Sequence, residues 1–392
     1  MTQFKFKYPL YFIFIVIVSC KKPYAPPAIT TQRSYLVVEG VINPDSGSTI
    51  IKLSRTVNLS SAKTANPETG AILSIQASTG NIYHLVETNK GTYATGGLNL
   101  DITKTYRLNI KTSNNQQYAS DYVPVKVTPP IDSVGFLTQA SGVQLYVNTH
   151  DANNNTRYYR WDYTETWQFH AQYFSAFITN GTSIVTRRQD QFVYYCFAND
   201  ASSSIILGSS AKLSKDIIYQ NPITFIASNS EKVGMKYSIM VNEYALTGDA
   251  YNFYSNLKKN TEQLGSIFDA QPSNINSNIH NISNPAEPVI GYVSACTVQS
   301  KRIFISNSQL PSSWVPANTM HCELDSNWFA RPGSRPPENQ VLEFLVPITS
   351  TTIPVSAFYA PGLPNIIGYI GADVNCVDCT LRGTTTTPVF WK

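Results

Sequence analysis

Charged residues are scarce in this sequence. They make up 14% of the 392 residues, against about 25% in an average soluble protein. Lysine and arginine exceed the acidic residues by only four, and no basic run or Lys/Arg-rich segment occurs. A small excess spread over this length gives no electrostatic footprint for DNA or RNA, so nucleic-acid binding is excluded. The hydrophobic content of 42% supports folded cores and argues against a disordered chain.

The local motifs of common enzymes are also missing. The sequence contains no Gly-x-Ser-x-Gly, no His-Glu-x-x-His and no phosphate-binding glycine loop. We therefore expect no catalytic residues, no cofactor, no metal site and no enzymatic activity. A secreted hydrolase, with catalytic residues brought together from distant segments, is the alternative. The histidines are scattered along the chain: His84, His150, His170, His280 and His321.

No apolar run is long enough to cross a membrane. The longest runs from Leu10 to Val18, whereas a transmembrane helix needs about 20 residues. Lys5 and Lys7 precede it, and Ile17-Val18-Ser19-Cys20 follows the pattern that lipoprotein signal peptidase reads. We expect residues 1–19 to be a signal peptide and Cys20 to carry the lipid that binds the protein to a membrane. An ordinary signal peptide that happens to contain a cysteine is the alternative.

Six cysteines occur, and Cys20 is assigned to the lipid. Export places the other five in a compartment that permits disulfides, and the odd number leaves at least one free thiol. Cys296 ends an apolar run and is the expected free thiol. Zinc binding by a Cys-x-x-Cys pair with His321 and Cys322, or thiol exchange, are alternatives with weaker support. The expected disulfide-forming residues are Cys196, Cys322, Cys376 and Cys379.

Hydrophobic patterning predicts a mainly β protein. Residues 20–33 contain three prolines and read as a tether. About seven short strands follow, so residues 34–128 are expected to form an immunoglobulin-like β-sandwich. Residues 129–392 are expected to form a larger β-rich domain with few short helices. One helix is predicted after Thr247, which can cap it, because Ala250, Phe253, Tyr254 and Leu257 share one face.

Aromatic residues make up 12% of the chain, and several cluster in the second domain. Aromatic side chains on sheets stack on sugars or anchor partners, although many are half-buried core residues. Trp161, Trp167 and Tyr194 are the binding candidates. The long aperiodic segments 264–287 and 307–340 also favour a binding surface in this domain, since such loops often carry function.

Several segments together resemble one family, and they span nearly the whole chain after Cys20. The sequence is similar to the uncharacterised lipoproteins of the Bacteroidota phylum that are grouped as domain-of-unknown-function family 4249. The segments are Tyr35 to Gly40, Pro130 to Val134, Leu257 to Gln263, Gly265 to Asp269, Gln271 to Ser273, Gly291 to Ser294, Lys301 to Ile305, Cys376 to Cys379, and Phe390-Trp391.

The resemblance implies an outer-membrane lipoprotein of the kind often encoded beside TonB-dependent receptors. It supplies no catalytic residues. We expect a non-enzymatic accessory or ligand-capture subunit of a TonB-dependent nutrient receptor, which would take a small nutrient, glycan or peptide. The alternative is a stand-alone glycan- or peptide-binding lipoprotein of the cell surface. Lys21-Lys22 departs from the acidic residues that often follow the cysteine in surface-exported relatives, which leaves open whether the protein faces the cell surface or the periplasm.

Overall fold

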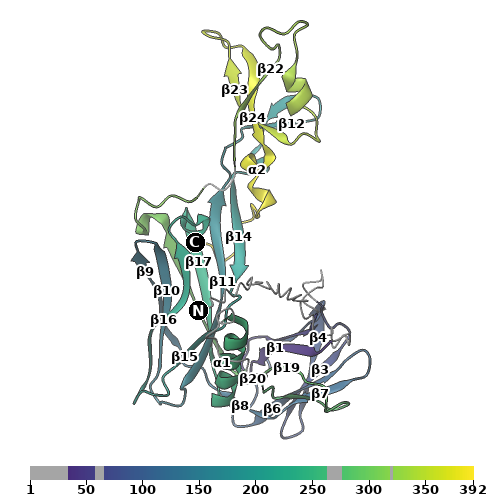
Figure 1. The fold of residues 1–392 in the computed structure, drawn as a ribbon, viewed down its shortest axis with the longest axis vertical. Helices are drawn as coiled ribbons and strands as arrows, with labels where there is room; N and C mark the ends of the chain where they lie inside the picture. Colours follow the sequence, from purple (N-terminus) through teal and green to yellow (C-terminus); the bar gives the residue numbers. More distant parts are fainter. Residues whose placement is uncertain (1–33, 58–65, 263–275, 318–320) are drawn as a thin grey trace, which may run out of the picture.

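The computed structural model describes residues 34–57, 66–262, 276–317 and 321–392. The predicted signal peptide, Cys20 and the tether lie outside the described residues. The mainly β fold class is confirmed, and the strands form three parts: an N-terminal unit, a central sandwich and a distal unit (Figure 1). Among the described residues, no helix is both long and apolar enough to pass through a membrane.

The N-terminal unit is a sandwich whose strands alternate between buried and exposed side chains. Ile51 and Leu53 are buried, while Ile50 and Lys52, which alternate with them, are exposed, as the period of two in a strand requires. These strands and three later ones form one continuous sheet, and pairing between β6 and β8 closes it on itself like a barrel. The strands are β1 (Leu36–Ile42), β2 (Thr49–Arg55), β3 (Ile72–Ala77), β4 (Ile82–Asn89), β5 (Thr92–Thr95), β6 (Thr105–Lys111), β7 (Gln117–Ser120) and β8 (Val123–Lys126).

Three strands from much later in the chain complete this unit. They are β18 (Ile279–Asn281), β19 (Ile290–Gly291) and β20 (Ser294–Cys296). β19 and β20 pair with β1 in parallel, and β18 pairs with β7. Their neighbours Val289 and Val293 belong to the same core. The expected division into 34–128 and 129–392 therefore separates strands that the structure unites, because β19 and β20 pair with β1 and β20 also pairs with β8.

The central sandwich packs a three-stranded sheet on a five-stranded sheet. Side chains from both inner faces form one core, which includes Val143, Leu145, Trp161 and Ile239. The first sheet contains β9 (Ile131–Gln139), β10 (Gly142–Asp151) and β16 (Asp216–Ala227). The second contains β14 (Tyr195–Ala201), β11 (Tyr158–His170), β17 (Lys236–Ala245) and β21 (Val298–Ser306), with β15 (Ile206–Ser209) beside β11.

A carboxyl group lies inside this sandwich. Glu243 has no exposed surface and accepts hydrogen bonds from Trp161 Nε1 at 2.8 Å and Thr149 Oγ1 at 2.9 Å. Burial away from water raises the pKa of Glu243 to about 7, although the two hydrogen bonds oppose the increase.

The predicted helix is present as α1 (Gly248–Glu262). The Thr247 hydroxyl accepts a hydrogen bond from the Ala250 backbone N–H at 3.2 Å, so Thr247 caps the helix as expected. Ala250 and Phe253 are buried, and the Phe253 ring lies 5.4 Å from the ring of Tyr292 in the N-terminal unit. The helix also contacts β11 and β15, so it packs between the N-terminal unit and the central sandwich.

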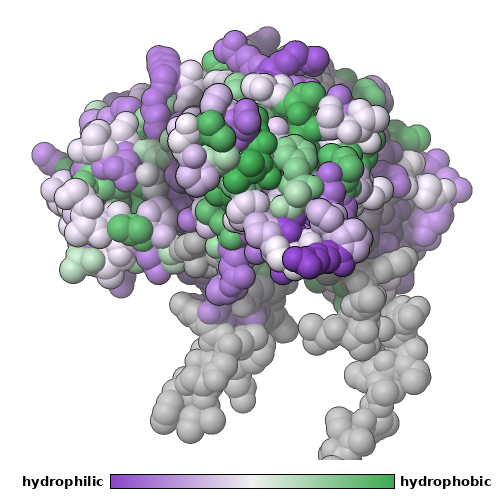
Figure 2. Space-filling view, turned by 90° about the horizontal axis from the view of Figure 1, so that it is seen from above, coloured by the Kyte–Doolittle hydropathy of each residue, from purple (hydrophilic) through white to green (hydrophobic). Residues whose placement is uncertain are grey.

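The distal unit combines residues that follow β11 with residues 325–377 near the end of the chain. Its small core includes Phe177, Val341, Leu345 and Tyr369. Apolar side chains also interrupt the polar surface at this end of the molecule (Figure 2). The elements are β12 (Phe177–Thr179), β13 (Ile184–Thr186), β22 (Asp325–Trp328), a π-helical turn (Val341–Leu345), β23 (Thr352–Tyr359), β24 (Ile366–Asp373) and α2 (Val374–Val377). Single 3-10 turns elsewhere are Gln189–Gln191, Glu231–Val233, Asn307–Gln309 and Cys379–Leu381.

Two disulfides tie the C-terminal segment in place. Cys196 is bonded to Cys379, and Cys322 is bonded to Cys376. Cys296 is buried and free. The predicted set of disulfide-forming residues and the predicted free thiol are thus confirmed, and no thiol of the four remains to ligate zinc.

Candidate functional site

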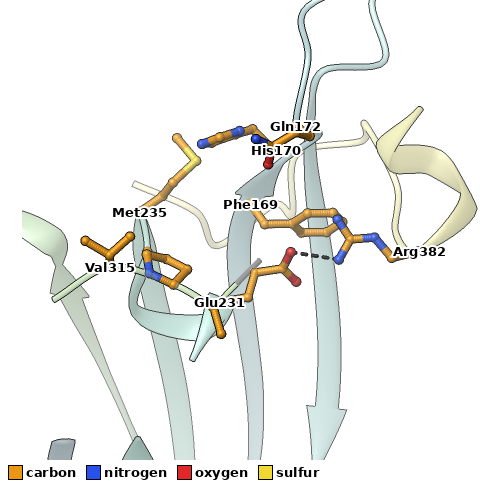
Figure 3. A pocket seen from close by; sticks show the side chains of 10 residues that line it. Phe169, His170, Gln172, Glu231, Met235, Val315 and Arg382 are labelled. Carbon is orange, nitrogen blue, oxygen red and sulfur yellow. Dashed lines mark hydrogen bonds and ion pairs between the residues drawn. The ribbon is translucent and has the colours of Figure 1, made fainter. Parts of the chain in front are cut away.

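A pocket of about 350 Å³ lies at the neck, where β11 leaves the central sandwich for the distal unit (Figure 3). Its apolar lining comes from Phe169, Met235, Val315 and Pro316. Val315 belongs to the aperiodic segment 307–340, so part of that segment does border a hollow surface. Phe169 is the second-to-last residue of β11, and the short turn after Glu231–Val233 supplies Met235. Segments far apart in the chain therefore build the pocket.

Two charged side chains at the rim of the pocket form an ion pair with each other. Arg382 Nη1 forms an ion pair with Glu231 Oε1 at 2.7 Å, and its guanidinium lies over the Phe169 ring at 4.6 Å from the centroid. Trp167 Nε1 donates a longer hydrogen bond to Glu231 Oε2 at 3.4 Å. Both charged side chains are about one-third exposed, so the pair adds little stability. It holds Arg382 and Glu231 across one side of the pocket.

His170 provides a polar group with an open nitrogen. Its Nδ1 lies 2.7 Å from the carbonyl oxygen of Ala171, and a carbonyl only accepts, so Nδ1 carries a hydrogen. Nε2 remains available to a ligand. The ring stacks on Tyr194, with centroids 5.0 Å apart, and meets Tyr195 edge-on at 6.3 Å.

An aromatic surface continues from His170 onto the distal unit. The ring of Tyr194 contacts Tyr195 at 4.6 Å and Phe174 at 5.5 Å, and Phe174 stacks on Phe192 at 5.3 Å. Tyr195 is 53% exposed and Phe174 is 49% exposed. Burial raises the pKa of the Tyr194 hydroxyl, with a smaller contribution from Tyr195, so this hydroxyl stays neutral. These five side chains, His170, Phe174, Phe192, Tyr194 and Tyr195, are the neck patch.

The three predicted binding residues have different positions. Trp161 is 1% exposed, so its assignment as a binding residue is wrong. It faces the sandwich core because alternate residues of β11 point inward. Trp167 is half-buried beside the pocket, and the Lys232 ammonium nitrogen lies 4.9 Å from the centroid of its ring. Tyr194 lies in the neck patch.

Other residues of the site were not predicted. His170, Phe174 and Phe192 carried no local signal that distinguished them from core residues. Arg382 reaches the pocket from the C-terminal segment, and nothing in its neighbourhood along the chain indicates this. Tyr194 was the one predicted binding residue that lies in the patch.

The arrangement is suited to binding. The pocket has an apolar floor, one open histidine nitrogen and a carboxylate already engaged by Arg382 and Trp167. Within the described ranges, no group of three or more His, Cys, Asp or Glu side chains is placed to hold a metal ion. A ligand with an apolar body and a hydrogen-bonding group beside His170 fits these surroundings.

Comparisons with known proteins give one family match. The model of a family described as a domain of unknown function (DUF4249) matches residues 21–302. No curated protein matches the chain.

Structural similarities to solved proteins are weak. The FN1–FN3 domains of chicken CNTN1 share 11% identity, with 53% of this chain and 59% of that chain covered and a TM-score of 0.18. The adhesin InvE of Yersinia pseudotuberculosis shares 14% identity, with 54% and 55% covered and a TM-score of 0.15. A putative carbohydrate binding protein from Bacteroides uniformis shares 9% identity, with 54% and 90% covered and a TM-score of 0.14. The chain thus spans less than two thirds of the first two structures.

Proposed function

The chain belongs to the DUF4249 family, and we propose that it is a non-enzymatic, lipid-anchored outer-membrane protein that serves as an accessory or ligand-capture subunit of a TonB-dependent nutrient receptor. The neck patch, together with its pocket, is the observation that carries this proposal. The lipid on Cys20 would hold the protein at the membrane, and a receptor loop would bind at the neck.

The neck patch has the composition of a protein interface. Tyrosine, phenylalanine and arginine are enriched at the centres of interfaces, where a few such residues supply most of the binding energy. Phe174 and Tyr195 are each about half exposed and stand in ring contact with partly buried neighbours. Rings held in this way lose little conformational freedom when a partner covers them. The adjacent pocket of about 350 Å³ has room for an apolar side chain of that partner.

The position of the neck suits a partner that extends from the membrane. The proposed anchor precedes β1, which belongs to the N-terminal unit. The central sandwich separates that unit from the neck (Figure 1). A protein anchored through Cys20 would therefore hold the neck patch away from the lipid, beside the outer loops or the periplasmic side of a receptor barrel.

Co-purification tests the proposal. The affinity-tagged full-length protein would be isolated from detergent-solubilised membranes of the native host, and its companions identified by mass spectrometry. We expect a TonB-dependent receptor in near-equal amount. The double variant Phe174→Ser/Tyr195→Ser should lose it. The control Tyr219→Ser changes a tyrosine that is 75% exposed on β16 and should retain the receptor.

Two results would count against this function. Recovery of the folded wild-type protein without any receptor would contradict the accessory role. Retention of the receptor by the double variant would show that the neck patch is not the contact surface.

A further inference from the structure

A second hollow lies far from the neck, between the N-terminal unit and the outer face of the five-stranded sheet. This cleft has a volume of about 530 Å³. One wall includes Glu39 of β1 and Lys52 of β2, and the other includes Arg160, Asp162 and Asn242 of the central sandwich. Arg160 and His170 are ten residues apart on one strand, so roughly 33 Å separates the cleft from the neck.

Arg160 lies in this cleft against the rings of two tyrosines. The guanidinium carbon lies 4.3 Å from the ring centroid of Tyr244 and 5.2 Å from that of Tyr254. None of its N–H groups donates a hydrogen bond to a described residue, and Nε is buried without a partner. Because the side chain is one-fifth exposed and lines the cleft, its terminal nitrogens can donate to a ligand.

An acceptor stands beside this donor at a distance too long for a direct hydrogen bond. Asp162 Oδ2 lies 3.7 Å from Arg160 Nη2. Asn242 Nδ2 donates to Asp162 Oδ1 at 2.8 Å, and Ser300 Oγ donates to Asn242 Oδ1 at 2.7 Å. This chain fixes the carboxylate through Oδ1, and the side chain of Tyr244 also hydrogen-bonds to Asp162. A carboxylate has about four lone pairs, so it can still accept from a ligand. A hydroxyl group that accepts from Arg160 and donates to Asp162 would use both groups at once.

The charges of the cleft favour a neutral ligand. Lys52 and Arg160 are positive, Glu39 and Asp162 are negative, and the four sum to zero. Asp162 and Glu39 would repel an anion, whereas Arg160 and Lys52 would repel a cation. Alternating donors and acceptors match a molecule with several hydroxyl groups, each of which donates and accepts. We infer that this cleft binds a neutral saccharide. The inference rests on the cleft alone and is independent of the function proposed for the neck patch.

Glycan binding tests the inference. The intact purified protein would be titrated with neutral oligosaccharides (maltohexaose, cellohexaose, xylohexaose and mannohexaose) and with acidic ones (oligogalacturonate and chondroitin sulfate fragments). We expect binding of at least one neutral oligosaccharide in preference to the acidic ones. Asp162→Asn and Arg160→Met should each weaken that binding at least tenfold, because each removes one side of the donor–acceptor pair.

Three further variants separate binding from folding and from the neck. Lys52→Ala changes an exposed residue on the opposite wall and should weaken binding severalfold, even if Arg160→Met does not fold. Arg107→Met removes a guanidinium that lies 4.8 Å from the Tyr122 ring outside the cleft and should leave binding unchanged. Phe174→Ser/Tyr195→Ser should also bind the oligosaccharide normally. The inference is overturned if no neutral oligosaccharide binds, if acidic ones bind better, or if the cleft variants bind as the wild type does.

Discussion

Cys376 and Cys379 lie three residues apart, and their disulfides lead to different parts of the molecule. Cys376 is bonded to Cys322, which precedes β22 of the distal unit, and Cys379 is bonded to Cys196 on β14 of the central sandwich. The single turn α2 and the residues after it therefore join the distal unit to the sandwich covalently, next to the neck patch.

Removal of the Cys196–Cys379 bond should destabilise this joint. We expect Cys196→Ser/Cys379→Ser to lower the free energy of unfolding by about 2–5 kcal/mol, and urea denaturation followed by tyrosine and tryptophan fluorescence would measure it. Cys296→Ala is the matched control, because it removes the free thiol and leaves both bonds intact. Peptide mapping without reduction should recover the two disulfides of the wild type, and any other pairing would contradict the described arrangement.

Glu243 should make the stability of the protein depend on pH. Its pKa is about 7 in the folded state, above the ordinary value of 4.5, so between these values the folded protein keeps a proton that the unfolded chain has lost. Stability should therefore fall as the pH rises from about 4.5 to 7, by about 3 kcal/mol for this group. Glu243→Gln cannot titrate, and the difference between its pH profile and that of the wild type isolates the effect. Parallel profiles would exclude a raised pKa at Glu243.

The cap of α1 should contribute a measurable share of stability. Thr247→Ala removes the acceptor for the Ala250 N–H and should cost about 1 kcal/mol. Thr247→Ser keeps the hydroxyl and should stay within a few tenths of the wild type. Thermal unfolding of the wild type and both variants would measure these changes in stability. An equal loss in both would show that the methyl group of Thr247, and not its hydroxyl, is responsible.

Trp161 and Tyr195 should affect different properties when they are changed. Trp161→Phe loses a buried hydrogen bond to Glu243 and leaves a cavity, so we expect a loss of about 2–4 kcal/mol in stability with partner binding retained. Tyr195→Ala, on the exposed neck patch, should leave stability within about 1 kcal/mol and weaken partner binding. Denaturation and co-purification should be measured on the same preparations. Loss of partner binding in Trp161→Phe, or a large loss of stability in Tyr195→Ala, would contradict the prediction.

The proposed lipid anchor depends on Cys20. Cys20→Ser should block addition of the lipid and stop processing by lipoprotein signal peptidase, because the sulfur atom of Cys20 is the proposed site of attachment. Metabolic labelling with a palmitate analogue should mark the wild type and not the variant. Two or three acyl chains give stable membrane binding where one gives only marginal binding. Incorporation of the label into the variant would refute the anchor.

Local features of the fold were predictable from the sequence. The cap at Thr247 and the apolar face of α1 involve residues within a few positions of one another, and the helix appears where the pattern places it. Short strands such as β2 and β3 also follow from alternation of apolar and polar residues. The disulfide-forming residues could be named because the expected export and the odd number of remaining cysteines left few choices.

Long-range features were not predictable in the same way. The run from Val289 to Cys296 reads as a buried strand, but its apolar pattern does not reveal that its partner is β1, some 250 residues earlier. Trp161 was misjudged because alternation along β11 shows that one set of side chains is buried and does not show which. Arg382 and Glu231 come together through the tail that the disulfides hold, so neither has a signal in its own segment.

The return of residues 279–296 to the N-terminal unit sets a limit on the order in which the protein can fold. If the protein is exported N-terminus first, as proposed, β1 to β8 emerge early, but the core they enclose still lacks Ile279, Val289, Val293 and Ala295. During this interval β1 is paired only with β2, and its other edge is open to wrong pairing with a neighbouring chain. We therefore expect the exported protein to need protection by a periplasmic chaperone until nearly three quarters of its length has crossed, and to aggregate most readily when export stalls before β20 emerges.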